Sequence, residues 1–220
     1  METTTEININ NLLKGYNMLL YFAGSMIMDE PTEECVDDFW LAGMIKALPV
    51  SSRNPRFLKA ASMLRGSCSE QLSCKKVFAV DFNGLFRSKG KAFPVESSWI
   101  NEAFVGGTVR TESVREFYDS YGWVSKYNGV VPDDHLGVEL LFLTLLIDKY
   151  ISLDDRACKK EMSREIRRFI RDHLLTWVPQ WNRQVQITAA TLCYKGIGTL
   201  IHAIAEDLDA IFTVSDRSGI

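Results

Sequence analysis

The stretch VPDDHLGVELLFLTLL, residues 131–146, places a polar Pro-Asp-Asp-His cluster directly before an almost unbroken apolar run. Only two polar side chains, Glu139 and Thr144, interrupt that run. Proline is tolerated in the first turn of a helix, and an aspartate there caps free N–H groups and complements the positive end of the helix dipole. We therefore expect a buried helix that begins near Asp133 or Asp134.

The Pro-Asp-Asp-His cluster is compatible with four roles. His135 and Glu139 are four residues apart, so they lie on one face of the expected helix, one turn from each other. Carboxylates and imidazole are common catalytic groups and metal ligands, whereas adjacent carboxylates such as Asp133 and Asp134 suit bidentate arginine binding. The fourth role is structural, with Asp134 capping the helix. The cluster is thus a catalytic site, a metal site, a recognition site or a helix cap.

Composition and charge narrow these choices. The 220 residues are 46% hydrophobic and 24% charged, which is typical of a soluble globular protein with a full core. A net charge of −3 gives no electrostatic footprint for nucleic acid. The longest strongly apolar run, residues 140–147, is far shorter than the ~20 residues that cross a bilayer, so we expect no stable membrane insertion.

The cysteine and histidine content argues against a metal site. Five cysteines without a C-x-x-C motif and only three histidines do not supply a recognisable metal shell, so we expect no metal and no cofactor. The N-terminal segment lacks the basic region of a secretory signal, so we expect a cytoplasmic protein with reduced thiols. A catalytic or metal role for the cluster is correspondingly disfavoured, and we do not expect an enzyme.

The periodicity of apolar residues predicts an all-α fold. Apolar side chains recur at helical spacing almost throughout, and no segment shows the strict alternation of a strand. We expect one all-helical domain over residues 1–220, a bundle of about ten helices. Glycines and prolines interrupt the helical pattern over residues 87–111. We expect this segment to be a long connection or hinge between two helical halves, at about 1–86 and 112–220. A monomer is the default, and the hinge permits a domain-swapped dimer.

Three other patterns have structural interpretations. Apolar residues from Ile187 to Ile211 predict one long final helix. Gly196 and Gly198 imitate half of a dinucleotide-binding motif, but no strand precedes them, so close helix packing explains them better. The basic residues of segment 159–171 alternate with acidic ones at helix-pair spacing, which indicates a solvated helix face.

The aromatic side chains at the entrance to the irregular connection have two interpretations. Phe82 and Phe86 precede it, and Phe93 and Trp99 lie in its first half. Core packing is the usual role of aromatic residues, but an aromatic groove beside a hinge also suits an incoming apolar peptide.

The order of the motifs is more specific than any single one. FNGLF at 82–86 is followed by FPVESSW at 93–99, PDDHL at 132–136 and HLLTWVPQW at 173–181. From about residue 77 to about residue 208, this order resembles the TorD/DmsD/NarJ family of cytoplasmic chaperones for molybdenum-containing redox enzymes.

The resemblance implies an all-helical, non-enzymatic protein with a peptide ligand. Such chaperones bind the twin-arginine signal peptide of a molybdopterin oxidoreductase, and often its apo-protein, and delay export until the cofactor is inserted. The cationic head and apolar segment of such a peptide call for carboxylates beside an apolar groove. The expected peptide-binding residues are Asp133, Asp134, His135, Glu139, Phe82, Phe86 and Trp99.

Two alternative functions remain open at this stage. One is a nucleotide-dependent switch or small helical enzyme that uses Asp134 and His135, since guanine nucleotide is suspected as a ligand of some members of the family that the chain resembles. The sequence contains no glycine-rich loop that would hold phosphate. The other alternative is a structural adaptor that grips a folded partner.

Overall fold

The computed structural model describes residues 4–68, 71–100 and 113–218. Within these ranges the chain is all-α, as predicted, and its only β-type pairing is one isolated bridge. None of the described helices combines the length and the apolar character that crossing a membrane requires. The α-helices are α1 (Thr4–Met28), α2 (Glu33–Val36), α3 (Pro55–Arg65), α4 (Gln71–Phe86), α5 (Val114–Ser120), α6 (Leu136–Ser152), α7 (Arg156–Phe169), α8 (Val178–Thr188) and α9 (Leu192–Ser218).

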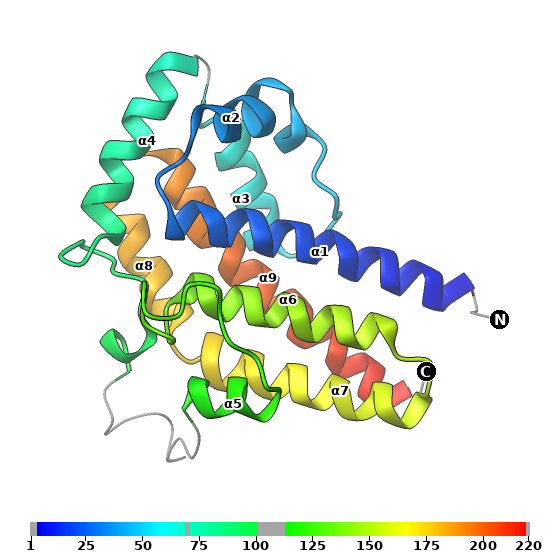
Figure 1. Ribbon diagram of the computed structural model, residues 1–220. Coiled ribbons are helices and arrows are strands. Elements are labelled where there is room, and N and C mark those ends of the chain that lie inside the picture. The colour runs from blue at the N-terminus through cyan, green and yellow to red at the C-terminus, as the bar shows by residue number, and fades with distance from the viewer. Residues whose placement is uncertain (1–3, 69–70, 101–112, 219–220) are drawn as a thin grey trace.

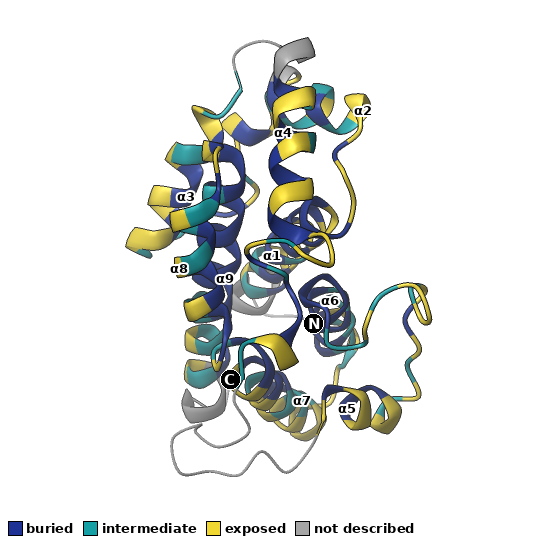
Figure 2. Cartoon of the chain, turned by 90° about the vertical axis from the view of Figure 1, so that its left-hand side faces the viewer, coloured by how far each residue is buried: buried dark blue, intermediate teal, exposed yellow. Residues whose placement is uncertain are grey.

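The long C-terminal helix α9 runs through the bundle and contacts α1, α3, α4, α7 and α8 (Figure 1). Its inward side chains, among them Ile197, Ile201, Ile204 and Leu208, are completely buried. Helices from both predicted halves of the chain pack together, because α1 lies along α6 and α3 lies along α9. Burial colouring shows the same arrangement, with buried residues facing the middle of the bundle and exposed residues on its outer faces (Figure 2).

Helices α1 and α6 approach each other closely at two glycines, which have no side chain to keep the backbones apart. Gly24 of α1 lies against the backbone carbonyl of Gly137 and the side chain of Leu140 in α6. A Cβ atom on Gly137 would overlap the side chain of Met28 at the end of α1. The start of α6, where the acidic cluster lies, is therefore held against α1.

The prediction of the final helix is wrong at its beginning. The helix is interrupted between Thr188 and Leu192, which separates α8 from α9. The carboxylate of Asp81 in α4 accepts hydrogen bonds from the backbone N–H groups of Ala190 and Thr191, at 3.0 and 2.8 Å, and from the hydroxyl of Thr191 at 2.6 Å. These bonds satisfy free donors at the start of α9. A partner about a hundred residues away thus determines where the last helix begins.

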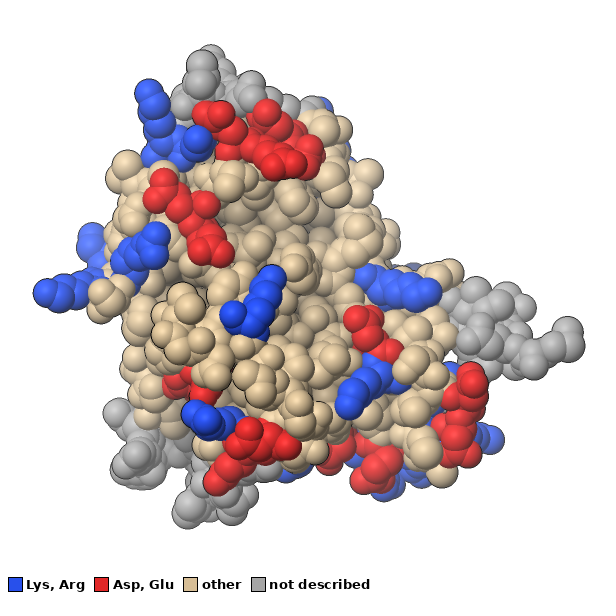
Figure 3. All heavy atoms as spheres, viewed as in Figure 1, with Lys and Arg blue, Asp and Glu red and all other residues tan. Residues whose placement is uncertain are grey.

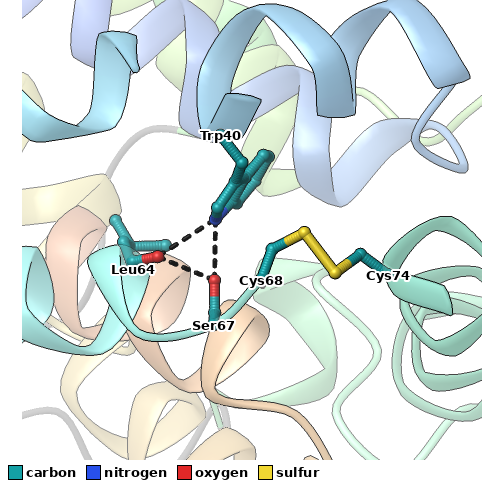
Figure 4. The surroundings of a disulfide bond; sticks show 5 residues. All are labelled: Trp40, Leu64, Ser67, Cys68 and Cys74. Carbon is teal, nitrogen blue, oxygen red and sulfur yellow. Dashed lines mark hydrogen bonds between the residues drawn. A yellow bond between two sulfur atoms is a disulfide. The ribbon is translucent and has the colours of Figure 1, made fainter. Parts of the chain in front are cut away.

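The expectation of five reduced cysteines is wrong for two of them. Cys68 and Cys74 form a disulfide that joins the end of the α3 region to the first turn of α4, with Cα atoms 5.7 Å apart (Figure 4). Beside it, the indole N–H of Trp40 donates to the carbonyl of Leu64 and to the hydroxyl of Ser67. The described cysteines that remain free are Cys35, Cys158 and Cys193.

Two structural interpretations of the sequence are confirmed. A Cβ on Gly196 would lie 2.7 Å from the side chain of Leu64, and one on Gly198 would lie 2.9 Å from that of Asn182, so both glycines permit close helix packing. The basic face of α7 and the turn after it is exposed and bears ion pairs. These are Arg164–Glu161, Arg168–Glu165 and Arg171–Asp209.

Candidate functional site

Two of the sequence motifs meet in space through backbone hydrogen bonds. Val95 and His135 form the isolated antiparallel bridge. The N–H of Leu136 donates to the carbonyl of Pro94 at 2.8 Å, and the N–H of Glu96 donates to the carbonyl of Asp134 at 2.9 Å. We call the segments 93–99 and 132–136 the paired loops. They place the Pro-Asp-Asp-His cluster beside the segment that contains Trp99.

Asp134 does not cap α6, so the capping role, one of the four that the sequence left open, does not apply to this residue. Its carboxylate instead accepts a hydrogen bond from the backbone N–H of Ser97 at 2.9 Å, across the paired loops. The helix begins at Leu136, and the cap is His135, whose Nδ1 accepts from the N–H of Gly137 at 3.1 Å. A turn from Pro132 to His135 moves the helix start beyond both aspartates.

The cap requires a neutral imidazole, because a protonated Nδ1 cannot accept a hydrogen bond. His135 is only 4% exposed. Burial lowers its pKa to about 4, against the opposing effect of the Asp134 charge. His135 is therefore uncharged near neutral pH and acts from within the fold.

Asp133 lies at the surface beside α5. Its carboxylate pairs with the guanidinium of Arg115 at 3.2 Å, and its backbone carbonyl accepts from the hydroxyl of Tyr118 at 3.1 Å. The Arg115 side chain is 68% exposed and the Asp133 side chain 28%. In this partly exposed ion pair, a carboxylate of the cluster is already bound to an arginine.

Two acidic residues, one in the paired loops and one in α6, are buried. Glu139 is fully buried in α6, and Glu96 is 1% exposed with its Oε2 3.5 Å from Nδ1 of the buried His173. Burial raises the pKa of the Tyr118 hydroxyl well above its usual value, and the nearby charges of Glu139 and Glu96 add to that rise. Sequence reasoning did not single out Glu96 or His173, although both lie within motifs that carried the family resemblance.

The aromatic residues expected at the site separate into two groups. Trp99 is half-buried and its indole N–H donates to the carbonyl of Phe93 at 2.8 Å, within the paired loops. Phe82 and Phe86 lie in the core, 1% and 3% exposed, where both contact the ring of Tyr194. The structure thus brings Trp99 together with the aspartates, and it places the two phenylalanines in the wall behind.

That wall supports the paired loops indirectly. The ring of Phe86 stacks on Trp181, and the indole N–H of Trp181 donates to the carbonyl of Ala92, just before the first paired loop. The N–H of Ala92 also donates to the carbonyl of Leu85 in α4. Phe86 therefore supports the first paired loop indirectly, through its packing against Trp181.

The chemistry available at this surface is that of recognition. In the part of the chain that the structure describes, no group of three or more His, Cys, Asp or Glu side chains is placed to hold a metal ion. The accessible polar groups are the carboxylates of Asp133 and Asp134, with the half-buried Trp99 alongside. Carboxylates beside an aromatic surface suit a ligand that is cationic and apolar.

Comparison with known proteins points to the same segment of the chain. The family model described as "Nitrate reductase delta subunit" matches residues 55–183, a range that contains both paired loops. Chaperone protein TorD of Photobacterium profundum is 24% identical over 209 residues, which cover 90% of this chain and 94% of that protein.

Two further relatives with the same name extend the comparison. Chaperone protein TorD of Vibrio cholerae is 25% identical over 179 residues, or 79% of each chain. Chaperone protein TorD of Aliivibrio fischeri is 23% identical over 174 residues, or 74% of this chain and 79% of that protein.

Proposed function

From the premise that this chain belongs to the nitrate reductase delta subunit family, the family of the TorD chaperones, we propose that it is a molybdoenzyme maturation chaperone. It binds the twin-arginine signal peptide and the apo-protein of a molybdopterin oxidoreductase in the cytoplasm and holds them until the cofactor is inserted. The observation that carries this proposal is the family match over residues 55–183, together with TorD relatives similar along most of the chain. The relatives are named chaperones, and we accordingly assign this protein a binding role and no catalytic residue.

The proposed contact for the arginine pair is the surface around Asp133. A guanidinium already lies against this carboxylate, since Arg115 donates to its Oδ2 at 3.2 Å. An arginine of the peptide would take the place of Arg115 with the same geometry. Exposed ion pairs contribute only about 0.2–1 kcal/mol, so the exchange requires little free energy.

Asp134 and Trp99 have complementary roles in the proposed site. Asp134 adds negative charge and, through its bond to Ser97, fixes the loop that carries Trp99. Trp99 offers apolar surface to the segment that follows the arginines. Burial of ~300 Å² of apolar peptide would contribute about 7 kcal/mol before ordering costs. One or two arginine pairs then bring the affinity to about micromolar, which permits release.

The remaining predicted residues act from behind this surface. His135 caps α6 and Glu139 is buried one turn further along the same helix. Phe82 and Phe86 form the core wall on α4. We propose that these four residues position the binding surface, whereas Asp133, Asp134 and Trp99 contact the peptide.

A direct titration tests this assignment. A fluorescent twin-arginine peptide and its Lys-Lys variant are titrated against the wild type, Asp133→Asn and Asp134→Asn. We expect the arginine peptide to bind the wild type more tightly and both variants to bind it several-fold more weakly. Asp119→Asn, which neutralises an exposed carboxylate at the end of α5, is the matched control. Equal affinity in every combination would refute the site.

No observation among the described residues favours a guanine nucleotide ligand. Gly196 and Gly198, the nearest imitation of a nucleotide motif, lie within α9 and face Leu64 and Asn182. A phosphate-binding loop requires free backbone N–H groups, and a helix interior does not provide them. The monomer or domain-swapped dimer remains a prediction, as does the hinge at 87–111, of which residues 101–111 lie outside the described part.

A further inference from the structure

A cavity of about 380 Å³ opens between α4 and the connection from α8 to α9. Val77, Val80 and Leu85 line it from α4, and Ala190 lines it from the connection. Val77 is 48% exposed and Val80 is 75% exposed. A Cβ on Gly84, near the end of α4, would have no heavy atom within 4 Å, so the space beside this lining residue is open. Figure 2 shows this side of the molecule, with exposed residues along the outer face of α4.

The cavity has a basic rim. Lys76 and Lys91 border it, and within the described residues neither side chain has an ion-pair partner. Figure 3 shows basic side chains gathered at the left edge of the molecule, over the end of α4 and the turn that follows it. The single carboxylate in the lining, Asp81, is 7% exposed and is bound to the start of α9. The Asp81 carboxylate therefore faces the interior of the fold and its own hydrogen-bond donors.

Two acidic residues beside α4 have partners other than the lysines of the rim. Glu33 pairs with Lys75, and Glu30 accepts a hydrogen bond from the side chain of Asn83. Neither Lys75 nor Asn83 lines the cavity. An apolar hollow with unpaired lysines at its edge attracts a segment that is apolar and acidic, and it disfavours a cationic one.

From this charge pattern we propose that the α4 cavity binds an amphipathic, acidic segment of the client apo-protein outside its signal peptide. The inference rests on the proposed function for the source of the segment. The twin-arginine signal is cationic, so Lys76 and Lys91 repel it, whereas the carboxylates of the paired loops attract it. The volume lies within the ~300–1,000 Å³ range of ligand pockets and suits apolar anchors spaced along one helix face.

The leader and a segment of the client body would then bind at separate places. Asp133 and Asp134 contact the leader, and Val77 and Val80 contact a segment of the body. Because the two surfaces have opposite charge, each rejects the segment that the other binds. A client held at both surfaces gains affinity through the high effective concentration of the second segment.

The test uses two designed peptides of about 16 residues, long enough for helix formation. One has leucines on one face and glutamates on the other, and its partner has lysines in place of the glutamates. Binding is measured by fluorescence anisotropy at low and physiological ionic strength. We expect the wild type to prefer the Leu/Glu peptide by about tenfold or more, equivalent to about 1.4 kcal/mol.

Variants on the cavity rim provide the decisive comparison. Val80→Glu should weaken Leu/Glu binding by about tenfold, and the double variant Lys76→Glu with Lys91→Glu should transfer the preference to the Leu/Lys peptide. Val124→Glu is the control, since Val124 is 69% exposed in another part of the fold. Circular dichroism checks that all variants fold. A Leu/Glu peptide that does not bind, or that binds every variant equally, would overturn the proposal.

A twin-arginine peptide separates this inference from the proposed function. Its binding should be unaffected by Val80→Glu and weakened by Asp133→Asn. If it does not bind while the Leu/Glu peptide does, the leader site fails and the α4 cavity stands. If Val80→Glu weakens it and Asp133→Asn does not, the cavity is the leader site and the present inference is wrong.

Discussion

The carboxylate of Asp134 accepts the backbone N–H of Ser97 at 2.9 Å, and this bond joins two loops that are 37 residues apart in the sequence. The Asp134 side chain thus acts as a hydrogen-bond acceptor within the fold, and it also carries a negative charge. Substitutions that remove one property at a time can therefore distinguish loop positioning from charge recognition.

Asp134→Asn and Asp134→Ala should differ in stability. The asparagine carbonyl can still accept from Ser97, so Asp134→Asn should keep the free energy of unfolding within about 0.5 kcal/mol of the wild type. Asp134→Ala should lose about 1 kcal/mol with the hydrogen bond. Both should bind the arginine peptide more weakly. Urea unfolding and peptide titration measure the two effects, and equal loss of stability in both variants would contradict the positioning role.

Arg115→Ala should bind a twin-arginine peptide more tightly than the wild type. The substitution removes the guanidinium that pairs with Asp133, so an incoming arginine displaces nothing. Since an exposed pair contributes at most about 1 kcal/mol, the gain should not exceed about fivefold. Arg53→Ala, which removes an exposed arginine from the loop before α3, should leave the affinity unchanged. Weaker binding by Arg115→Ala would indicate that Arg115 itself contacts the peptide.

Acid should destabilise the fold through His135. Its pKa is about 4 when folded and about 6.5 when unfolded, so the unfolded chain binds more protons between these values. The stabilisation is present above pH 6.5 and is lost as the pH falls toward 4, a loss of up to about 3 kcal/mol at about 1.4 kcal/mol per pKa unit.

The comparison for this pH effect is His135→Asn, because asparagine is a good helix cap that does not titrate. Burial also lowers the pKa of His202, which contributes to the same trend in both proteins. The informative quantity is thus the difference between the two unfolding free energies across pH 4–7. A difference that stays constant over this range would show that His135 is not a buried, neutral cap.

Reduction of the Cys68–Cys74 disulfide should lower stability. The bond closes a short loop, with a sequence separation of 6, and chain-entropy reasoning gives about 2 kcal/mol for such a closure. Thermal unfolding with and without dithiothreitol should therefore differ for the wild type and agree for the Cys68→Ser, Cys74→Ser double variant. Cys158→Ser changes an exposed free cysteine and should retain the response to reductant.

The sequence predicted those features that depend on neighbouring residues. The helix at α6 follows from the apolar run after Pro132, and the all-α class follows from helical periodicity along the chain. The break before α9 could not be predicted from periodicity, because Asp81 determines it from another helix. The capping role of His135 could not be predicted either. Aspartate is a more usual helix cap than histidine, and Asp133 and Asp134 directly precede His135.

The candidate site was predictable in its segments and less so in its side chains. Motif order indicated the loops around Trp99 and Asp134, and the structure pairs these loops. Nothing in the sequence showed that Phe82 and Phe86 face the core, because an apolar residue on a helix suits a groove and a core equally. The pairing of Cys68 with Cys74 also depends on how the segment between α3 and α4 turns.

The close contact of α1 with α6 bears on which part of the chain folds by itself. The family model spans residues 55–183, but Gly24 and Met28 of α1 pack against the start of α6, and α9 lies wholly beyond that range. A fragment trimmed to the matched residues would expose the inner faces of α3 and α6 to water. The recognisable signature is therefore not an autonomous folding unit, and the helices outside it form part of the minimal protein.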